Sequence, residues 1–295
     1  MKRLIILFFV VNTFNAFPQN KFYDYAYMSK TSIYVYSTIE KKQYFVANDG
    51  SDPRISPNGQ KLAYTRYSGD GSRFINLIDL NTKVKTTLNT HSNNCYGPVW
   101  SPDGKFLAYN VILGNVWCVA INNLSNSKIT VLENKGKDNF SPIWLSSGKN
   151  IAVQNMEKIL VYDLSGKVVS TYNDKDLIGG LSELSDGVGH SSSDQFVFSN
   201  DNKKIIFNTD LIDPTVKSDD GLTPAIFIYD IGSKKTLRLS PTGYSAFRPV
   251  MTGELILFNA EKGSSAKTRS IYSIDMNGKN LKLLFANCRD ISAKN

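Results

Sequence analysis

The sequence predicts an all-β fold, a six-bladed β-propeller of four-stranded antiparallel blades, from a hairpin that recurs at a fixed spacing. Residues 98–109 (PVWSPDGKFLAY) read as a strand, a type I turn and a second strand, because Pro102 presets φ and Gly104 takes the left-handed position that closes the turn. Residues 53–64 are a near copy beginning 45 positions earlier, and the proline within residues 141–149 follows the central one by 44 positions. This period is typical of a propeller blade.

A second repeated turn supports the same fold. Four aspartates end strand-like runs and are followed by Asn, Ser or Gly and then by lysine, at Asp79, Asp163, Asp230 and Asp275. An aspartate in this place accepts backbone hydrogen bonds while the small or polar residues after it supply positive φ. We therefore assign these aspartates to the turn between the third and fourth strands of a blade, and not to catalysis.

The N-terminus reads as an export signal. Lys2 and Arg3 precede an apolar run over residues 4–11, about half of the roughly 20 residues that a membrane span needs. A buried first strand is the alternative, but nothing in the run alternates. We expect residues 1–19 to be a signal peptide and residues 20–295 to form the propeller, so that the mature chain is periplasmic or secreted and does not span the membrane.

The remaining strands complete the ring. Residues 33–46 align without gaps on residues 226–239, so residues 23–46 supply the outer three strands of one blade. Five further blades are expected at 44–90, 91–134, 135–177, 178–243 and 244–285. Residues 287–292 are placed to add the inner strand to the N-terminal blade, so that N-terminal strands pair with the C-terminal strand and no sheet edge is left exposed.

Composition narrows the functional classes. Removal of Lys2 and Arg3 lowers the net charge from +8 to +6, and the lysines are spread over turns, which favours a solvated surface over nucleic-acid binding. Two histidines exclude a multi-histidine metal centre, and no cofactor motif is present. The cysteines, at irregular spacing, are expected to be buried free thiols rather than one disulfide and a thiol: Cys95, Cys118 and Cys288.

The repeated P-x-W-S-P-D-G-K-x-L-A-Y hairpin, followed by the I-Y-x-x-D turn, resembles the TolB-type β-propeller repeat, a relative of WD-like repeats. The resemblance covers nearly all of the mature chain and implies six blades. TolB proper carries an α/β domain ahead of its blades and works with the peptidoglycan-associated lipoprotein in the periplasm. Only a few residues separate the expected signal from the first strand of this chain, so we expect that domain to be lacking.

One face of the propeller is expected to carry function. The loops between blades and those between second and third strands share a face, and the long insertions fall there, at residues 66–73, 179–194, 208–224 and 261–269. Tolerated surface insertions are the alternative. The aspartates at 210, 213, 219 and 220 crowd one insertion, and a solvated acidic loop is favoured over a calcium site because their spacing fits no calcium-binding loop.

Seven residues precede or begin inner strands and are expected at the channel mouth as ligand-binding candidates: Arg54, Tyr96, Asn139, His190, Tyr244, Arg248 and Arg289. Three arginines from different blades could converge on an anionic group, since the guanidinium fork holds a carboxylate or phosphate at two points. Taken singly, each arginine is better explained as solvated or as part of an internal ion pair.

Two functions follow from this arrangement. The first is an exported, non-enzymatic module that binds an envelope protein or peptide through its long-loop face. The alternative is a carbohydrate-active enzyme, a glycoside hydrolase or polysaccharide lyase, with a site at the channel mouth built from His190, Tyr244, Arg248 and Arg54. The sequence has neither a G-x-S-x-G nor an H-E-x-x-H motif. We therefore assign no catalytic residue, and an anionic or a carbohydrate ligand stays open.

Overall fold

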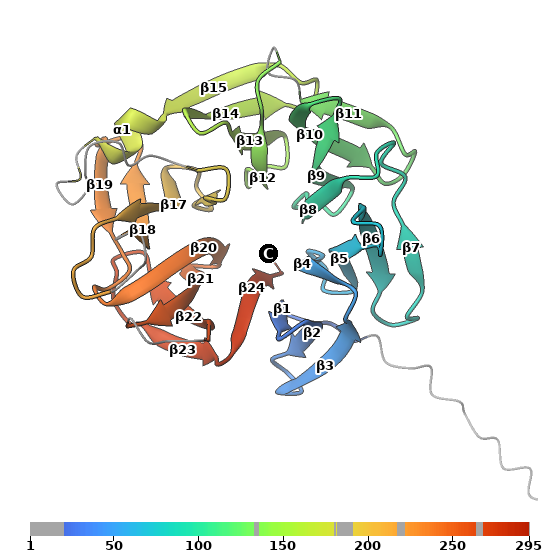
Figure 1. Cartoon of the computed structure of the whole chain (residues 1–295), viewed down its shortest axis with the longest axis horizontal. Helices are drawn as coiled ribbons and strands as arrows, with labels where there is room; N and C mark the ends of the chain where they lie inside the picture. Colours follow the sequence, from blue (N-terminus) through green and yellow to red (C-terminus); the bar gives the residue numbers. More distant parts are fainter. Residues whose placement is uncertain are drawn as a thin grey trace, which may run out of the picture.

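The computed structural model describes residues 21–132, 136–179, 181, 191–216, 222–263 and 268–294. These residues form six four-stranded antiparallel sheets arranged as blades around a central axis (Figure 1). The prediction of an all-β six-bladed propeller is confirmed. The described part contains a single α-helix, α1 (Asp174–Ile178), and no helix in it is long and apolar enough to cross a membrane.

The six blades follow one another along the chain, and the strands of each run from the inner to the outer edge. Blade 1 contains β24 (Cys288–Ala293), β1 (Tyr25–Ser29), β2 (Ser32–Ser37) and β3 (Lys42–Ala47); blade 2 contains β4 (Gly50–Ile55), β5 (Lys61–Tyr67), β6 (Arg73–Asp79) and β7 (Lys85–Thr87); blade 3 contains β8 (Cys95–Trp100), β9 (Phe106–Leu113), β10 (Val116–Asn123) and β11 (Ile129–Leu132). Blade 4 contains β12 (Phe140–Trp144), β13 (Asn150–Gln154), β14 (Lys158–Asp163) and β15 (Val168–Asn173); blade 5 contains β16 (Phe196–Phe198), β17 (Lys204–Leu211), β18 (Thr223–Asp230) and β19 (Lys235–Arg238); blade 6 contains β20 (Tyr244–Thr252), β21 (Leu255–Lys262), β22 (Ser270–Asp275) and β23 (Lys282–Phe285).

The two ends of the chain close the ring in blade 1, as expected. Strand β24 pairs antiparallel with β1, from Tyr25 opposite Ala293 to Ser29 opposite Cys288, and Figure 1 shows red β24 beside blue β1. The junction also bonds to blade 2, because the Ile55 amide donates to Ser292 Oγ at 3.0 Å. Closure therefore rests on strand pairing within blade 1 and on a buried hydrogen bond to its neighbour.

Both repeated turns have the predicted chemistry. In the hairpin, the Gly104 amide donates to the Ser101 carbonyl at 2.8 Å, and Gly104 has φ +69°. In the outer turn, Asp79 accepts from the amides of Asn81 and Thr82 at 3.0 and 2.9 Å. Hydrogen bonds from following backbone amides lower the pKa of Asp79, and they do the same for Asp275. These aspartates therefore serve the turns.

The inner strands differ from the prediction in where they begin. The repeated prolines were expected to start them, but β8 begins three residues earlier, at Cys95, and Pro98 lies inside the strand at a register shift between Tyr96 and Val99. The same shift occurs in β4, β12 and β20. A proline has no amide hydrogen to donate, so a bulge is where a paired strand accommodates one.

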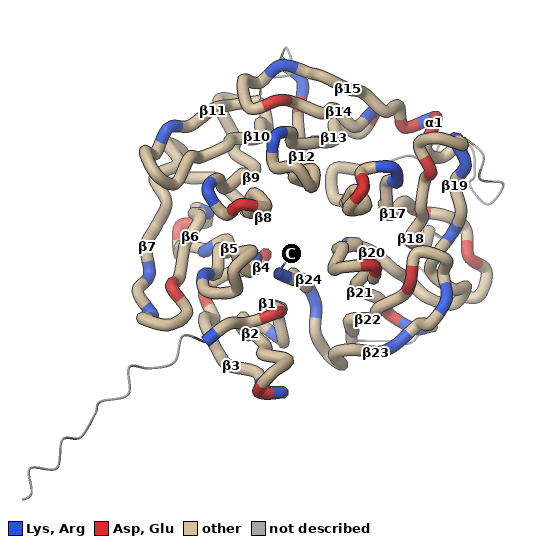
Figure 2. Tube along the Cα trace, turned by 180° about the vertical axis from the view of Figure 1, so that it is seen from behind, with Lys and Arg blue, Asp and Glu red and all other residues tan. Residues whose placement is uncertain are grey.

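The tryptophan of the hairpin joins successive blades. The Trp100 indole donates to the Arg54 carbonyl at 2.9 Å, and Trp144 donates to the Val99 carbonyl at 3.3 Å. Cys95, Cys118 and Cys288 are all buried and form no disulfide, which confirms the prediction of buried thiols. Lysine and arginine are distributed among acidic residues over all six blades rather than gathered on one of them (Figure 2).

Candidate functional site at the channel mouth

A cavity of about 700 Å³ opens on the long-loop face and is lined by residues from all six blades. We call it the mouth cavity. A second cavity, of about 140 Å³, lies among the short turns that carry Pro57 and Pro102. Arg54, Val99, Ile143 and Gln195 line both cavities. These four residues therefore mark the narrow middle of the channel, with the larger opening on the face where the long insertions lie.

The bulges supply the side chains of the mouth cavity. Five inner strands carry a residue of positive φ at the same place: Asp52, Gly97, Ser141, Arg248 and Asp290, with φ between 51° and 62°. In the first four, this residue immediately precedes the proline of the bulge. All five line the mouth cavity. The repeat thus turns one residue of each of these strands inward, whatever its side chain.

The second strand of the preceding blade holds four of the five bulges in place. A buried side-chain oxygen accepts the amide hydrogen of the bulge residue in four cases: Thr65 from Gly97 at 3.0 Å, Asn110 from Ser141 at 3.1 Å, Asn208 from Arg248 at 3.1 Å and Asn259 from Asp290 at 2.9 Å. The bulge exposes an amide that the sheet ladder does not use, and a buried amide without an acceptor is costly. These polar side chains therefore fix the geometry of the mouth from behind.

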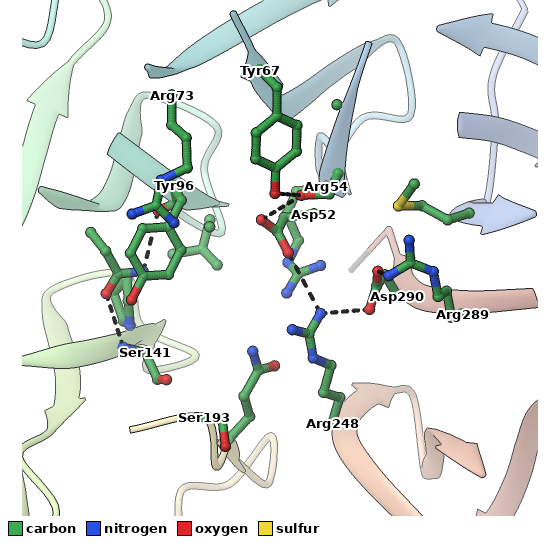
Figure 3. A pocket seen from close by; sticks show the side chains of 18 of the residues that line it. Asp52, Arg54, Tyr67, Arg73, Tyr96, Ser141, Ser193, Arg248, Arg289 and Asp290 are labelled. Atoms are coloured by element: carbon green, nitrogen blue, oxygen red, sulfur yellow. Dashed lines mark hydrogen bonds and ion pairs between the residues drawn. The ribbon is translucent and has the colours of Figure 1, made fainter. Parts of the chain in front are cut away.

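Arg248 is the centre of a charged cluster. Its Nη1 lies 2.5 Å from Asp290 Oδ1 and 3.5 Å from Asp52 Oδ1, and Arg289 contacts the other oxygen of Asp290 at 3.1 Å (Figure 3). Burial by itself would lower the pKa of Arg248, but the charges of Asp290 and Asp52 outweigh it and raise that pKa. The cluster joins blades 1, 2 and 6 and neutralises two arginines with two carboxylates.

Arg54 has a different environment. Among the described residues, its guanidinium makes one hydrogen bond, from Nη1 to the Pro53 carbonyl at 3.1 Å, and no carboxylate lies within ion-pair distance. Burial lowers the pKa of Arg54, since the loss of hydration outweighs the favourable charge of Asp52. A cation is therefore held at the narrow middle of the channel with little compensation from its surroundings.

Aromatic rings line the wall formed by blades 2 and 3. The Arg73 guanidinium lies 4.4 Å from the ring centre of Tyr96 and 5.3 Å from that of Trp117, and its Nε donates to Asn94 at 2.7 Å. Tyr67 lies on the same side and is 49% exposed. Planar, partly exposed groups of this kind accept apolar or planar ligand groups by stacking.

The seven sequence candidates fall into three groups. Arg54, Tyr96, Arg248 and Arg289 line the mouth cavity together. Asn139 and Tyr244 do not: Asn139 is fully buried between blades and donates to the Leu132 carbonyl at 3.1 Å, and Tyr244 packs against Tyr272 with ring centres 5.5 Å apart. His190 lies outside the described residues. A ligand-binding role stays a prediction for all seven.

Sequence reasoning missed Asp52, Asp290 and Arg73. A signal for Asp52 was present, because it occupies the same place before proline as Gly97, Ser141 and Arg248.

Asp213 was expected in a solvated acidic loop, and that expectation was wrong. Its side chain is 1% exposed and pairs with Arg238 at 2.9 Å. No cluster of histidine, cysteine and acidic residues within the described ranges has the geometry of a metal site.

Asp194, beside the mouth, should make stability depend on pH. Its carboxylate accepts from the Ser191 amide at 2.7 Å and from Asn208 Nδ2 at 2.6 Å, and burial, with the charge of Asp210, raises its pKa to about 6. A folded-state pKa above the unfolded value means that the folded chain gains protons first, so this group adds stability as pH falls through 6 and stops adding near 4. The gain is on the order of 2 kcal/mol.

The measurement is urea unfolding of the wild type and of Asp194→Asn between pH 7.5 and 4.5. The wild type should gain stability relative to the variant as pH falls, because asparagine does not titrate. Any constant cost of placing an amide nitrogen next to the Ser191 amide cancels in this comparison. A difference that is the same at both pH values would contradict the assignment.

The chain matches no family model and no curated protein sequence. Its structure is similar to TolB from Acinetobacter baumannii, with a TM-score of 0.67 and 17% identity over 92% of this chain and 66% of that one, so this chain spans less than two thirds of the length of that TolB. A putative TolB from Agrobacterium tumefaciens superposes with a TM-score of 0.63 and 15% identity, covering 90% of each chain.

A third similar structure has a lower sequence identity. A chain of a nidogen/laminin complex superposes with a TM-score of 0.62 at 9% identity, covering 92% of this chain and 98% of that one. At these identities the likeness concerns the fold. The chain is a six-bladed β-propeller structurally similar to the C-terminal propeller domains of TolB proteins.

Proposed function

We propose that this chain is an exported binding module that holds a protein or peptide of the cell envelope in the mouth cavity. The observation that carries the proposal is the cavity of about 700 Å³, to which all six blades contribute. That volume lies within the range of pockets that bind ligands of a few hundred daltons. Such a pocket has room for the end of a chain or the tip of a loop, with a larger partner resting on the surrounding face.

The chemistry of the lining favours binding over hydrolysis. Asp52 accepts from Ser51 and Thr65 and pairs with Arg248, while both oxygens of Asp290 pair with arginines. A glycoside hydrolase needs one carboxyl group to donate a proton and another to act as base or nucleophile. Carboxylates committed to arginines act instead to position those arginines. The third lining aspartate, Asp49, accepts from Tyr64 Oη at 3.1 Å, so the described lining has no pair of carboxyl groups free of arginine for a glycoside hydrolase. Tyr244, expected in the carbohydrate-active site, does not line the cavity.

The proposed function includes export of the chain from the cytoplasm. The apolar run behind Lys2 and Arg3 supports cleavage near residue 19 and a periplasmic or secreted mature chain. One of the structurally similar chains comes from a complex of two proteins, nidogen and laminin, which supports a binding role for this type of ring. Cell fractionation with mass spectrometry of the mature N-terminus tests the location.

Crosslinking in envelope extract tests the binding. Arg73→Ser removes a cation from the mouth wall, and Lys105→Ser removes an exposed cation from the opposite face as a matched control. We expect one defined partner to be retained by the wild type and by Lys105→Ser, to be reduced at least severalfold with Arg73→Ser, and to crosslink to residues of the mouth. Equal capture by both variants, or crosslinks confined to the opposite face, would refute the proposal.

A further inference from the structure

The charges of the mouth cavity do not cancel. Four arginines and three aspartates are among its described lining residues, which leaves one positive charge: Arg54, Arg73, Arg248, Arg289, Asp49, Asp52 and Asp290. Arg248 and Arg289 are paired with Asp290. Arg73 is stacked on Tyr96 and Trp117 and bonds to Asn94. Arg54 and Arg73 are therefore the two lining arginines without an ion-pair partner among the described residues, and Arg54, at the narrow middle of the channel, also lacks the ring stacking that holds Arg73.

Resting on the binding function proposed above, we propose that the mouth cavity anchors its peptide partner by a single carboxylate that is received by the guanidinium of Arg54. Within the described part of the chain the guanidinium bonds to the Pro53 carbonyl alone, which leaves most of its five N–H donors for a ligand. A carboxylate accepts two of them in parallel, and such a charged bond is about twice as strong as a neutral one.

The number of charges favours a carboxylate over a phosphate. Asp52 and Asp290 both lie close enough to Arg54 for their charges to act on it. A monoanion beside Arg54 brings the cavity to neutrality, whereas a phosphate dianion would leave an excess of negative charge near two aspartates. Like charges at short range in a partly buried site are unfavourable.

The position of Arg54 favours the end of a peptide. Arg54 lies where the two cavities meet, so a group that reaches it from the mouth passes the wall of Tyr67, Arg73 and Tyr96. An extended segment spans about 3.3 Å for each residue. A segment entering with its carboxylate ahead would place the following side chains against the aromatic wall, where stacking and apolar contact are available.

An NMR titration of the full mature chain tests the anchor. The probe is N-acetyl-triglycine with a free carboxylate, and the side-chain arginine Nε–H signals report contact. We expect saturable shifts of the Arg54 signal, identified by its absence from Arg54→Gln, and an affinity lower by about tenfold or more in that variant. Arg54→Lys should retain part of the affinity because it keeps the charge.

Matched probes and variants complete the design. The C-terminal amide of the probe should leave Arg54 unshifted, and N-acetyl-glutamate α-amide, which carries its carboxylate on the side chain, tells which source of carboxylate is preferred. Arg269→Gln, a loss of the same charge at a residue paired with Glu261 outside the mouth, should bind like the wild type. Equal binding of the amide, unchanged affinity in Arg54→Gln, or a response to inorganic phosphate or glucuronate alone would overturn the proposal.

The anchor and the binding function fail in different ways. If the carboxylate probe binds at Arg54 but no envelope protein is captured, the anchor stands and the proposed function fails. If a partner is captured equally by the wild type and Arg54→Gln but is lost with Arg73→Ser, the function stands and the anchor is refuted.

Discussion

Asp213→Asn should destabilise the propeller by about 3–5 kcal/mol, the cost of leaving one member of a buried ion pair without its partner. The Asp213 side chain is 1% exposed and that of Arg238 is 13% exposed, with 2.9 Å between Oδ2 and Nη2. Asp213 also accepts from Thr215 and from the Gly243 amide. The pair ties the loop after β17 to the end of β19 in the same blade. Arg238 also donates to the carbonyls of Ser240 and Pro241, so loss of the pair also affects the connection to blade 6.

The effect has a pH signature that a loss of packing would not produce. Burial opposes the charge of Asp213, but hydrogen bonds from Thr215 and Arg238 outweigh it and lower its pKa to about 2. The stabilisation is therefore fully present above pH 4 and is lost as pH falls through 2. Urea unfolding should show a constant deficit for Asp213→Asn from pH 8 to 5 that shrinks below pH 4.

A double variant separates the pair from its surroundings. Asp213→Asn with Arg238→Met should recover much of the lost stability, because an apolar replacement of a buried pair is often neutral. A deficit below about 1 kcal/mol for Asp213→Asn would place this pair with the surface ion pairs. Such a result would contradict its assignment as a buried contact.

Arg248 and Arg54 should respond to substitution in opposite directions, although both line the mouth cavity. Arg248→Gln leaves Asp52 without an ion-pair partner and leaves Asp290, which is 3% exposed, with Arg289 alone. We expect a loss of about 3 kcal/mol, at the lower end of the range for a buried pair because Arg248 is 32% exposed. Arg54→Gln removes a cation that has no such partner, and its stability should equal or exceed that of the wild type.

Thermal unfolding of both variants at pH 7 checks this contrast. A loss of about 3 kcal/mol should lower the Tm by roughly 6–12 °C in a domain of this size, whereas Arg54→Gln should unfold at or above the wild-type Tm. The glutamine variants have the same change of charge, so a general electrostatic effect would lower both by a similar amount. A similar fall in Tm for both variants would therefore refute the difference between the two arginines. Stability that is given up at one position for binding is common at functional sites.

The fold was accessible from the sequence because its evidence is local. Pro102, Gly104 and the four turn aspartates fix turns by their own conformational preferences, and the spacing of the turns gives the number of blades. Closure by residues 287–292 followed from counting, since one blade lacked an inner strand. The helix α1 was not predicted, because its five residues lie within a loop between blades that carries no periodic pattern.

The residues of the mouth cavity could be predicted only in part from the sequence, because which side chains meet there depends on the direction in which each one points. Arg54, Arg248 and Arg289 were found from their place near the inner strands, but their carboxylate partners come from other blades and lie far away in the sequence. Asn139 shows the opposite error. It precedes β12 as expected, yet its side chain turns between blades toward the Leu132 carbonyl.

The bulges have a consequence for how such a ring acquires specificity. The side-chain oxygens of four residues accept the main-chain amide hydrogens of the bulge residues: Thr65, Asn110, Asn208 and Asn259. These bonds therefore do not depend on which side chain the bulge residue carries. Those residues are a glycine, a serine, an arginine and an aspartate, each on the same support. Recognition can therefore be rewritten one blade at a time, while the scaffold that presents it is left intact.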